Sequence, residues 1–351
     1  MQYTDRRHAR RAVSVVVQGC RGMLLSLALL SAGAAAAAPD ERPSADTTAE
    51  QASRIPLWPA GMAPGDTALP QPQRIVERSS DAAVPDRYIQ SISAPYMVVY
   101  RPARPNGTAL LVTPGGGYQR IVLDNEGTSL VPGFVDQAGI TLFVLRYRLP
   151  GDGHPNGADV PLADAQRALR LIRANATRYG IDAQRVGVMG FSAGGHVAAS
   201  LGTRYAAQVY PAVDRADTLS ARPDFQLLIY PVIDMDAANA HMGSRERLLG
   251  NAPSEAKVRA YSPQWHVDAR TPPTFLLHAQ DDTVVSVRNS LLLHDALLRA
   301  GVPSELHVFP QGGHGFGTRG TTGLTLAAWP QLAQAWIQQV SAPAAPQDAP
   351  R

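Results

Sequence analysis

Short runs of apolar, β-branched residues alternate along this chain with longer segments of helical periodicity. Several of the apolar runs are about five residues long with no polar interruption, which is typical of strands buried on both faces. The predicted strands span Tyr96–Tyr100, Ala109–Thr113, Thr141–Tyr147, Val186–Met189, Phe225–Ile229, Thr274–His278 and Glu305–Phe309.

The segments between these strands carry the pattern of amphipathic helices. Apolar residues recur at steps of three and four over Leu162, Ala165, Leu169, Ile172 and Ala176. Gly180 then stands where a C-terminal cap belongs. Further helices are predicted over Gly194–Arg204, Val287–Ala300 and Thr325–Val340. The alternation predicts an α/β fold, with a mostly parallel central sheet and helices on both faces.

The two ends of the chain differ in composition from the region between them. An arginine-rich start, an apolar stretch from Met23 to Leu30 and a run of small residues to Ala38 predict a signal peptide over residues 1–38. The protein is then exported, to the periplasm or out of the cell. A membrane anchor is the alternative, but its uncharged stretch is short and rich in alanine. We predict a flexible leader over 39–53, one folded domain over 54–340 and a disordered Ala/Pro-rich tail over 341–351.

Charge and cysteine content narrow the partners of the mature protein. The leader holds five arginines against one aspartate, so without it the net charge falls from +3 to −1. This balance gives no electrostatic reason to expect a nucleic-acid partner. Cys20, the only cysteine, lies in the leader, so the mature chain has no disulfide and no thiolate metal site. Asp234 and Asp236 have no histidine at ligand spacing, and we expect neither a metal nor another cofactor.

The segment Gly190-Phe191-Ser192-Ala193-Gly194 matches the G-x-S-x-G pattern of a nucleophile elbow. Such an elbow is a sharp turn between a strand and a helix that exposes a serine hydroxyl. A predicted strand precedes this segment and a predicted helix follows it, so the context fits. Ser192 is therefore the candidate nucleophile, with a glycine-rich loop that only packs on the sheet as the alternative.

A glycine-rich loop, Pro114-Gly115-Gly116-Gly117-Tyr118, directly follows another predicted strand. Acyl transfer develops negative charge on the carbonyl oxygen, and preorganised backbone N–H donors stabilise that charge. Glycines leave such donors uncovered. We assign one donor to Gly116 or Gly117 and the other to Ala193, although a plain tight loop remains the alternative.

A serine nucleophile needs a base and an acid that orients it, and in this fold the chain order is serine, acid, histidine. His314, embedded in glycines after the last predicted strand, is the candidate base. Two adjacent aspartates follow the strand Thr274–His278, and we favour Asp282 over Asp281. His154, in a loop of Pro and Gly residues, is a candidate substrate contact.

Several short motifs taken together resemble the bacterial α/β-hydrolases of the acetyl esterase group. Within that group the chain is most similar to the acetylxylan-esterase-like branch, also labelled endo-1,4-β-xylanase-like. The motifs that carry the resemblance are Leu57-Trp58-Pro59, Pro114-Gly115-Gly116-Gly117-Tyr118, Tyr147-Arg148-Leu149-Pro150, Asp164-Ala165-Gln166-Arg167, Gly190-Phe191-Ser192-Ala193-Gly194-Gly195-His196, Leu248-Leu249-Gly250, Tyr261-Ser262-Pro263 and His314-Gly315-Phe316-Gly317.

The resemblance implies a serine carboxylesterase that hydrolyses short-chain, acetyl esters, with acetylated xylan or a related polysaccharide as candidate substrate. It also implies Asp282 as the acid, through a pattern that places His278 before it and Val285 after it; Ser286 departs from the proline that is usual there. One rival is a peptidase of the prolyl-oligopeptidase type, whose extra propeller domain this chain has no room for. Another is a carbohydrate-binding protein with a dead site. A broad lipase is a third, disfavoured because no long apolar lid segment is present.

Overall fold

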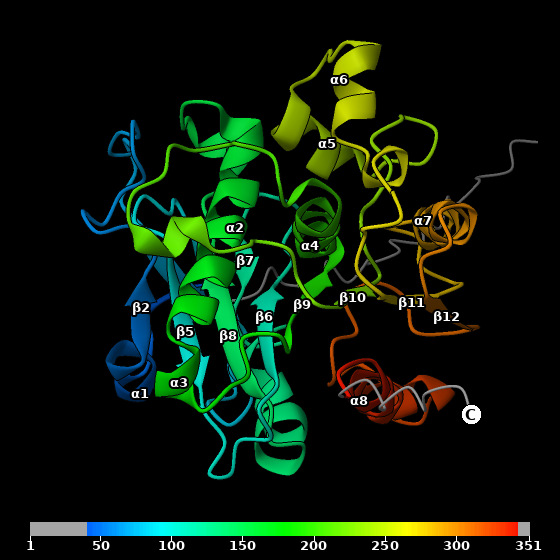
Figure 1. The fold of residues 1–351 in the computed structure, drawn as a ribbon, viewed down its shortest axis with the longest axis horizontal. Coiled ribbons are helices and arrows are strands. Elements are labelled where there is room, and N and C mark those ends of the chain that lie inside the picture. The colour runs from blue at the N-terminus through cyan, green and yellow to red at the C-terminus, as the bar shows by residue number, and fades with distance from the viewer. Residues whose placement is uncertain (1–40, 343–351) are drawn as a thin grey trace, which may run out of the picture. The chain divides into compact units, whose positions relative to one another are not determined.

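Eight strands form the main sheet of residues 41–342, the part of the chain that the computed structural model describes. In chain order they are β2 (Arg54–Pro56), β5 (Tyr96–Tyr100), β6 (Ala109–Thr113), β8 (Thr141–Arg146), β9 (Val186–Phe191), β10 (Gln226–Ile229), β11 (Thr274–Ala279) and β12 (Ser304–Phe309). Their order across the sheet is β12-β11-β10-β9-β6-β8-β5-β2 (Figure 1). Neighbours from β12 to β8 pair in parallel, whereas β5 and β2 run antiparallel at the edge. The predicted sheet is confirmed, and each predicted strand matches to within two residues at either end.

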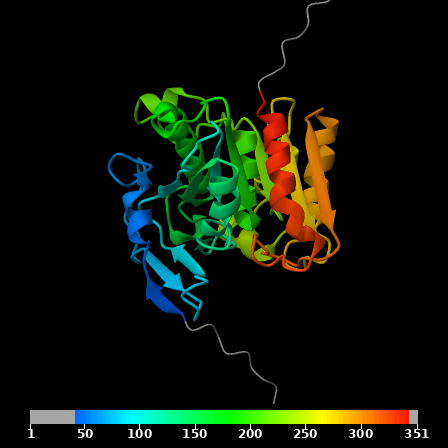
Figure 2. The ribbon, with the colours of Figure 1, turned by 90° about the horizontal axis from the view of Figure 1, so that it is seen from below.

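Helices cover both faces of this sheet, as the alternation predicts. The α-helices of the described residues are α1 (Thr48–Ala52), α2 (Val160–Ala174), α3 (Ala176–Tyr179), α4 (Ser192–Arg204), α5 (Met242–Leu249), α6 (Glu255–Ala260), α7 (Arg288–Arg299) and α8 (Trp329–Val340), and a π-helix spans Val131–Gln137. Helices α2, α4 and α7 lie on one face, and α8 lies with the π-helix on the other (Figures 1 and 2). Gly180 ends α3 in the left-handed conformation that its predicted capping role requires. Over residues 41–342, no helix is both long enough and apolar enough to cross a membrane.

Successive side chains of each strand point to opposite faces of the sheet, and they pack in two separate hydrophobic cores. In β6, Leu111 packs in the core under α2 and α4, while Leu110 and Val112 pack in the core that contains Phe134 and Trp329. Burying such a side chain contributes about 1.5–3 kcal/mol relative to leaving it exposed. The two cores hold the strands rigidly, and the carboxyl ends of β6, β9, β11 and β12 become a fixed platform for the loops that follow them.

A second, four-stranded antiparallel sheet is built from segments that are interleaved in sequence with the first strands of the main sheet. It comprises β1 (Arg42–Ser44), β3 (Arg74–Glu77), β4 (Arg87–Gln90) and β7 (Ile121–Val122), in the order β1-β3-β4-β7. Our prediction of a flexible leader over 39–53 is wrong for residues 41–53, because β1 and α1 lie there. The predicted signal peptide, and residues 343–351 of the predicted tail, lie outside the described residues.

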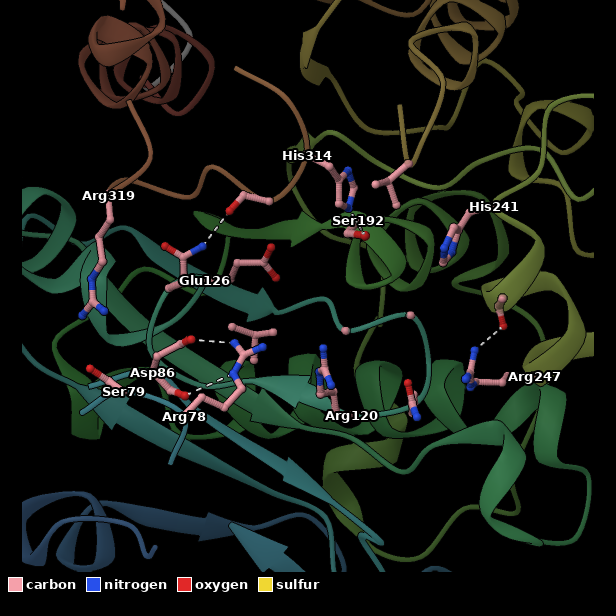
Figure 3. Close-up of a pocket in the computed structure, with 18 of the residues that line it drawn as sticks. Arg78, Ser79, Asp86, Arg120, Glu126, Ser192, His241, Arg247, His314 and Arg319 are labelled. Atoms are coloured by element: carbon pink, nitrogen blue, oxygen red, sulfur yellow. Dashed lines mark hydrogen bonds and ion pairs between the residues drawn. The ribbon is translucent and has the colours of Figure 1, made fainter. Parts of the chain in front are cut away.

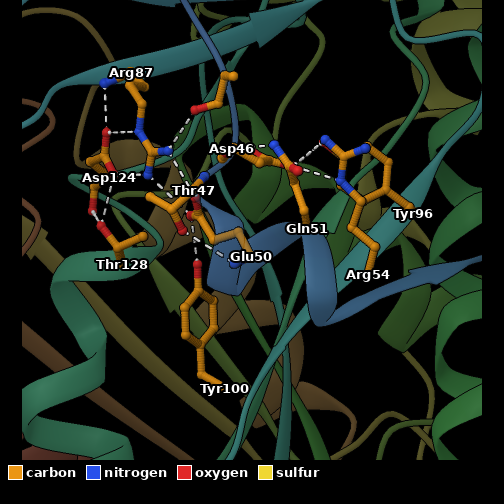
Figure 4. A network of polar contacts seen from close by, with 11 residues as sticks. Asp46, Thr47, Glu50, Gln51, Arg54, Arg87, Tyr96, Tyr100, Asp124 and Thr128 are labelled. Atoms are coloured by element: carbon orange, nitrogen blue, oxygen red, sulfur yellow. Dashed lines mark hydrogen bonds and ion pairs between the residues drawn. The ribbon is translucent and has the colours of Figure 1, made fainter.

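A buried ion-pair network attaches α1 to the rest of the domain (Figure 4). Arg87 pairs with Glu50 at 2.8 Å and with Asp124 at 2.7 Å, and all three side chains are buried. Thr47 caps α1 through a reciprocal pair of hydrogen bonds with Glu50. Burial opposes ionisation of Glu50, but hydrogen bonds from Arg87 and Thr47 outweigh it and lower the pKa to about 2. Partners 37 residues apart in sequence thus order a segment whose own composition predicts disorder.

Replacing Arg87 with methionine is expected to lower the free energy of unfolding by about 3–5 kcal/mol at neutral pH, because two buried carboxylates lose their partner. A carboxyl whose pKa is lowered on folding contributes stability that is complete above its ordinary pKa of 4.5 and is lost as the pH falls toward 2. Urea unfolding at pH 7 and pH 4 should therefore show a smaller difference between the two proteins at pH 4. Arg299→Met is the matched control: both side chains of its pair with Asp295 are largely exposed, and a loss of about 1 kcal/mol or less is expected. Equal losses in the two variants would contradict the prediction.

Candidate active site

The turn between β9 and α4 presents Ser192 at the end of the sheet. Ser192 is the first residue of α4 and has φ of 51°, a left-handed conformation that non-glycine residues rarely adopt. Such strain is typical of a nucleophile elbow. A Cβ atom on Gly194 would collide with the carbonyl oxygens of Thr113 and Pro114, so only glycine lets α4 pack this closely against the loop after β6.

Ser192, His314 and Asp282 form a continuous chain of hydrogen bonds. Ser192 Oγ lies 2.8 Å from His314 Nε2, and His314 Nδ1 lies 2.7 Å from Asp282 Oδ2. The three residues follow β9, β12 and β11, so the structure brings together side chains that are up to 122 residues apart in sequence. Asp281 has a different role: it is exposed, and its carboxylate accepts a hydrogen bond from the amide of Gly313 at 2.8 Å.

The environment of Asp282 keeps this carboxylate ionised. Its Oδ1 atom accepts hydrogen bonds from the amides of Val284 and Val285. His278 Nε2 lies 3.3 Å from Oδ2 and adds a contact to the atom that faces His314. Burial alone would raise the pKa of Asp282, but hydrogen bonds from His278 and His314 outweigh it and hold the pKa far below its ordinary value. A permanent negative charge thus faces the Nδ1 side of the His314 imidazole.

The candidate oxyanion donors are backbone amides of two segments, the glycine loop and the start of α4. Gly116 and Gly117 have φ of 131° and 64°, and both line the same pocket as Ser192 and His314. Neither amide donates a hydrogen bond to another residue of the described chain. Ala193 is the second residue of α4, and amides in a first helical turn have no partner within their helix. The three amides predicted as oxyanion donors therefore border one pocket or belong to the elbow beside it.

Glu126, which sequence reasoning missed, links the glycine loop to the histidine loop. It is buried and accepts hydrogen bonds from the amide of Gly115 at 2.6 Å and from the Tyr230 hydroxyl at 2.9 Å. The Tyr230 hydroxyl also accepts from the amide of Gly317, and the Tyr230 ring contacts the His314 ring edge to face at 5.0 Å. Burial raises the pKa of Glu126, although its two hydrogen bonds oppose the shift. No local sequence pattern indicates this role, because the contacts span 11 to 104 residues.

Replacing Glu126 with alanine is expected to lower kcat on an ester by about tenfold to hundredfold with little change in KM. The reason is that the amide of Gly115 loses its anchor and the donors beyond it lose their alignment, a smaller defect than deleting a donor outright. Glu126→Gln keeps an oxygen for that amide and should restore most of the rate. Steady-state kinetics separates kcat from KM, and the thermal midpoint of each variant reports folding. Wild-type kcat in the alanine variant would show that the loop does not depend on Glu126.

Two of the remaining histidines are buried and have structural partners. His196 lies between the Tyr118 hydroxyl and the Tyr261 carbonyl, at 2.7 Å from each, and burial lowers its pKa to about 4. His154 lies 3.0 Å from a carboxylate oxygen of Asp66 and does not line the pocket. His154 is therefore not a substrate contact in this pocket, because it is buried against Asp66, which pairs with Arg148.

The pocket that contains Ser192 has a volume of about 790 Å³. It is lined by residues from segments that are distant in sequence (Figure 3). Arg78, Asp86 and Arg120 reach it from the small sheet and its loops, while His241 and Arg247 reach it from the start and body of α5. None of these residues lies in a motif that sequence analysis identifies. Over residues 41–342, no cluster of three or more His, Cys, Asp or Glu side chains is arranged to hold a metal ion.

A Ser-His-Asp chain of hydrogen bonds at the strand ends of this sheet defines a serine hydrolase of the α/β-hydrolase fold. A model of the BD-FAE family matches residues 97–297, and the chain belongs to this family of α/β-hydrolase esterases. The match confirms the fold and the resemblance that the motifs predict.

Two bacterial proteins are similar in sequence to more than half of this chain. An acetylxylan esterase of Xylanibacter ruminicola is 34% identical over 226 residues, which are 63% of this chain and 43% of that protein. Endo-1,4-beta-xylanase B of Butyrivibrio fibrisolvens is 37% identical over 206 residues, which are 59% of this chain and 32% of that protein. The chain thus spans less than half the length of either relative.

Among solved structures, an acetyl ester-xyloside bifunctional hydrolase from Caldicellulosiruptor lactoaceticus is 36% identical, with a TM-score of 0.66. The match covers 82% of this chain and 96% of that one. Unlike the two longer relatives, this hydrolase matches along almost all of its own length.

Proposed function

We propose that this protein hydrolyses short-chain carboxylic esters, above all acetyl esters, through an acyl-enzyme on Ser192. The observation that carries the proposal is the chain of hydrogen bonds from Asp282 through His314 to Ser192, at 2.7 and 2.8 Å, which opens onto a pocket. Each contact has the length that proton transfer and orientation need.

In the proposed mechanism His314 takes the proton of Ser192 as the hydroxyl attacks the ester carbonyl. Asp282 holds the imidazole with Nδ1 protonated, so that Nε2 is free to act as base, and its charge stabilises the imidazolium that forms. The amides of Ala193 and of Gly116 or Gly117 receive the oxyanion. His314 then protonates the leaving alcohol. In the second step His314 takes a proton from water as the water attacks the acyl-enzyme, and it returns the proton to Ser192 as the acid leaves.

Acetylated xylan, or a related polysaccharide, is the substrate that we propose. The support is the similarity to an acetylxylan esterase, to a xylanase and to an acetyl ester-xyloside hydrolase. The volume of about 790 Å³ also suits this proposal, because sugar residues flanking a small acyl group need such room. Export, which we propose from the arginine-rich and apolar leader, would place the enzyme where polymeric substrates occur.

The test is the release of acetate from acetylated xylan and from 4-nitrophenyl acetate by the purified protein. We expect acetate from both, with rates that fall as the acyl chain of the 4-nitrophenyl ester lengthens from acetyl to octanoyl. Hydrolysis of the small ester alone would retain the mechanism and reject xylan. A rate that rises with acyl length would favour a lipase, and no release from either substrate would overturn the proposed esterase.

A further inference from the structure

Four arginines line the pocket that contains Ser192: Arg78, Arg120, Arg247 and Arg319. They come from separate segments, namely the residues after β3, the loop before β7, α5 and the loop after His314. Figure 3 shows Arg319 toward one end of the pocket and Arg247 toward the other, with Arg78 and Arg120 between them. Because four different segments contribute, the cluster is not the solvated face of a single helix.

The carboxylates in the same lining neutralise only one of the four arginines. Asp86 is paired with Arg78, with a separation of 2.7 Å between Nη2 and Oδ1. Glu126 accepts from the amide of Gly115 and the hydroxyl of Tyr230, and it pairs with none of the four arginines. Within the described residues, three guanidinium groups of the pocket therefore have no carboxylate partner: Arg120, Arg247 and Arg319.

These three side chains are nevertheless held in place. Arg247 donates to the carbonyl of Gly243 at 2.8 Å, and Arg319 donates to the carbonyl of Pro85 at 2.6 Å. The Arg120 guanidinium lies over the ring of Tyr88, 5.0 Å from its centroid. Each contact leaves most donors of the guanidinium unused. The pocket that contains Ser192 is therefore lined by three guanidinium groups with free donors, two of them partly buried (Arg120 and Arg247) and one exposed (Arg319).

Cations that converge on one cavity repel each other, and an anion relieves that repulsion while it satisfies the free donors. A neutral acetyl group needs no such neighbour. Arginine is also the residue that best matches the planar geometry of a carboxylate. The pocket therefore has the chemistry of a site for a negatively charged substrate.

We propose that the preferred ester carries a carboxylate in its alcohol part, as an acetylated oligosaccharide with a uronic acid residue does. Arg120 and Arg247 bind that carboxylate directly. The positive charge of Arg319 adds electrostatic attraction for the same carboxylate. This inference rests on the proposed function, since acetate has no second charged group and the charge must lie on the alcohol. The arginines thus select the substrate rather than take part in the chemical step.

The test compares two aryl acetates that differ in one charge: 4-acetoxybenzoate, an anion, and its neutral methyl ester. The measured quantity is the ratio of kcat/KM for the anion to kcat/KM for the neutral ester, from acetate release. We expect a wild-type ratio of about ten or more, lost as ionic strength rises from about 0.01 M to about 1 M, which shortens the screening length from about 30 Å to about 3 Å. Each of Arg120→Gln and Arg247→Gln should lower the ratio by about tenfold, mainly through KM for the anion.

Arg104→Gln is the matched control, because Arg104 is exposed and lies before β6, at the end of that strand remote from Ser192. It should leave the ratio unchanged. A wild-type ratio near one, or equal ratios in all the proteins, would overturn the inference while acetate release preserved the proposed esterase. Absence of acetate from both esters would overturn the proposed function and this inference together.

Discussion

Replacing Ser192 with alanine is expected to lower kcat/KM for ester hydrolysis by about 10⁴ or more. The change deletes one hydroxyl, 2.8 Å from His314 Nε2, and leaves the base and the candidate oxyanion donors in place. Without the nucleophile no acyl-enzyme forms, and only water attack assisted by the remaining groups continues. The measurement is the initial rate of 4-nitrophenyl acetate hydrolysis, with active-site labelling by a fluorophosphonate as an independent readout.

Ser200 supplies a matched control for this prediction. It lies on the same helix, α4, and is as buried as Ser192, with 6% of its surface exposed in both cases. Ser200→Ala should retain wild-type kinetics and labelling. If Ser192→Ala retained more than about a tenth of the activity, the catalytic assignment would be wrong and a second nucleophile would have to be sought.

Replacing Asp282 with asparagine is expected to lower kcat by about 10⁴ with little change in the fold. The Oδ1 position accepts from the amides of Val284 and Val285, so an asparagine oxygen would stay there and its NH₂ group would face His314. His314 Nδ1 would then have to accept a hydrogen bond instead of donating one. In that tautomer Nε2 carries the hydrogen and cannot act as the base for Ser192.

The neighbouring residue, Asp281, distinguishes the catalytic role from a general effect of lost charge. Among residues 41–342 its carboxylate accepts from the amide of Gly313 alone, and an asparagine oxygen can take over that contact. Asp281→Asn should therefore keep kcat within a few-fold of wild type, whereas Asp282→Asn should not. The reverse order of effects would assign the acid to Asp281 and contradict the geometry described above.

The segments that sequence analysis predicted best are those in which local patterns coincide with tertiary contacts. The strands β5 and β6 have the predicted bounds, because both are continuous apolar runs buried in the sheet. Helix α2 follows the predicted periodicity, because its apolar stripe faces the sheet. The segment 41–53 was not predicted, because its order comes from the pairing of Glu50 with Arg87 rather than from its own apolar content.

The candidate triad was predictable for a related reason. In a parallel sheet the carboxyl ends of the strands lie along one edge, so residues placed directly after strands converge even when they are far apart in sequence. Ser192, Asp282 and His314 each follow a strand and each belong to a type that the chemistry requires. Strand positions and residue types were therefore sufficient to name them, and Asp282 was separated from Asp281 only as a preference.

The sequence by itself determined the order of strands and helices, the elbow, the glycine loop and the three triad candidates, because each is encoded by neighbours in the chain. Only the tertiary structure decided which aspartate faces His314, because that choice depends on the direction of two adjacent side chains. Only the tertiary structure placed Glu126 between two loops and brought four arginines into the pocket that contains Ser192. These features depend on contacts between distant segments, and no local periodicity or motif encodes them.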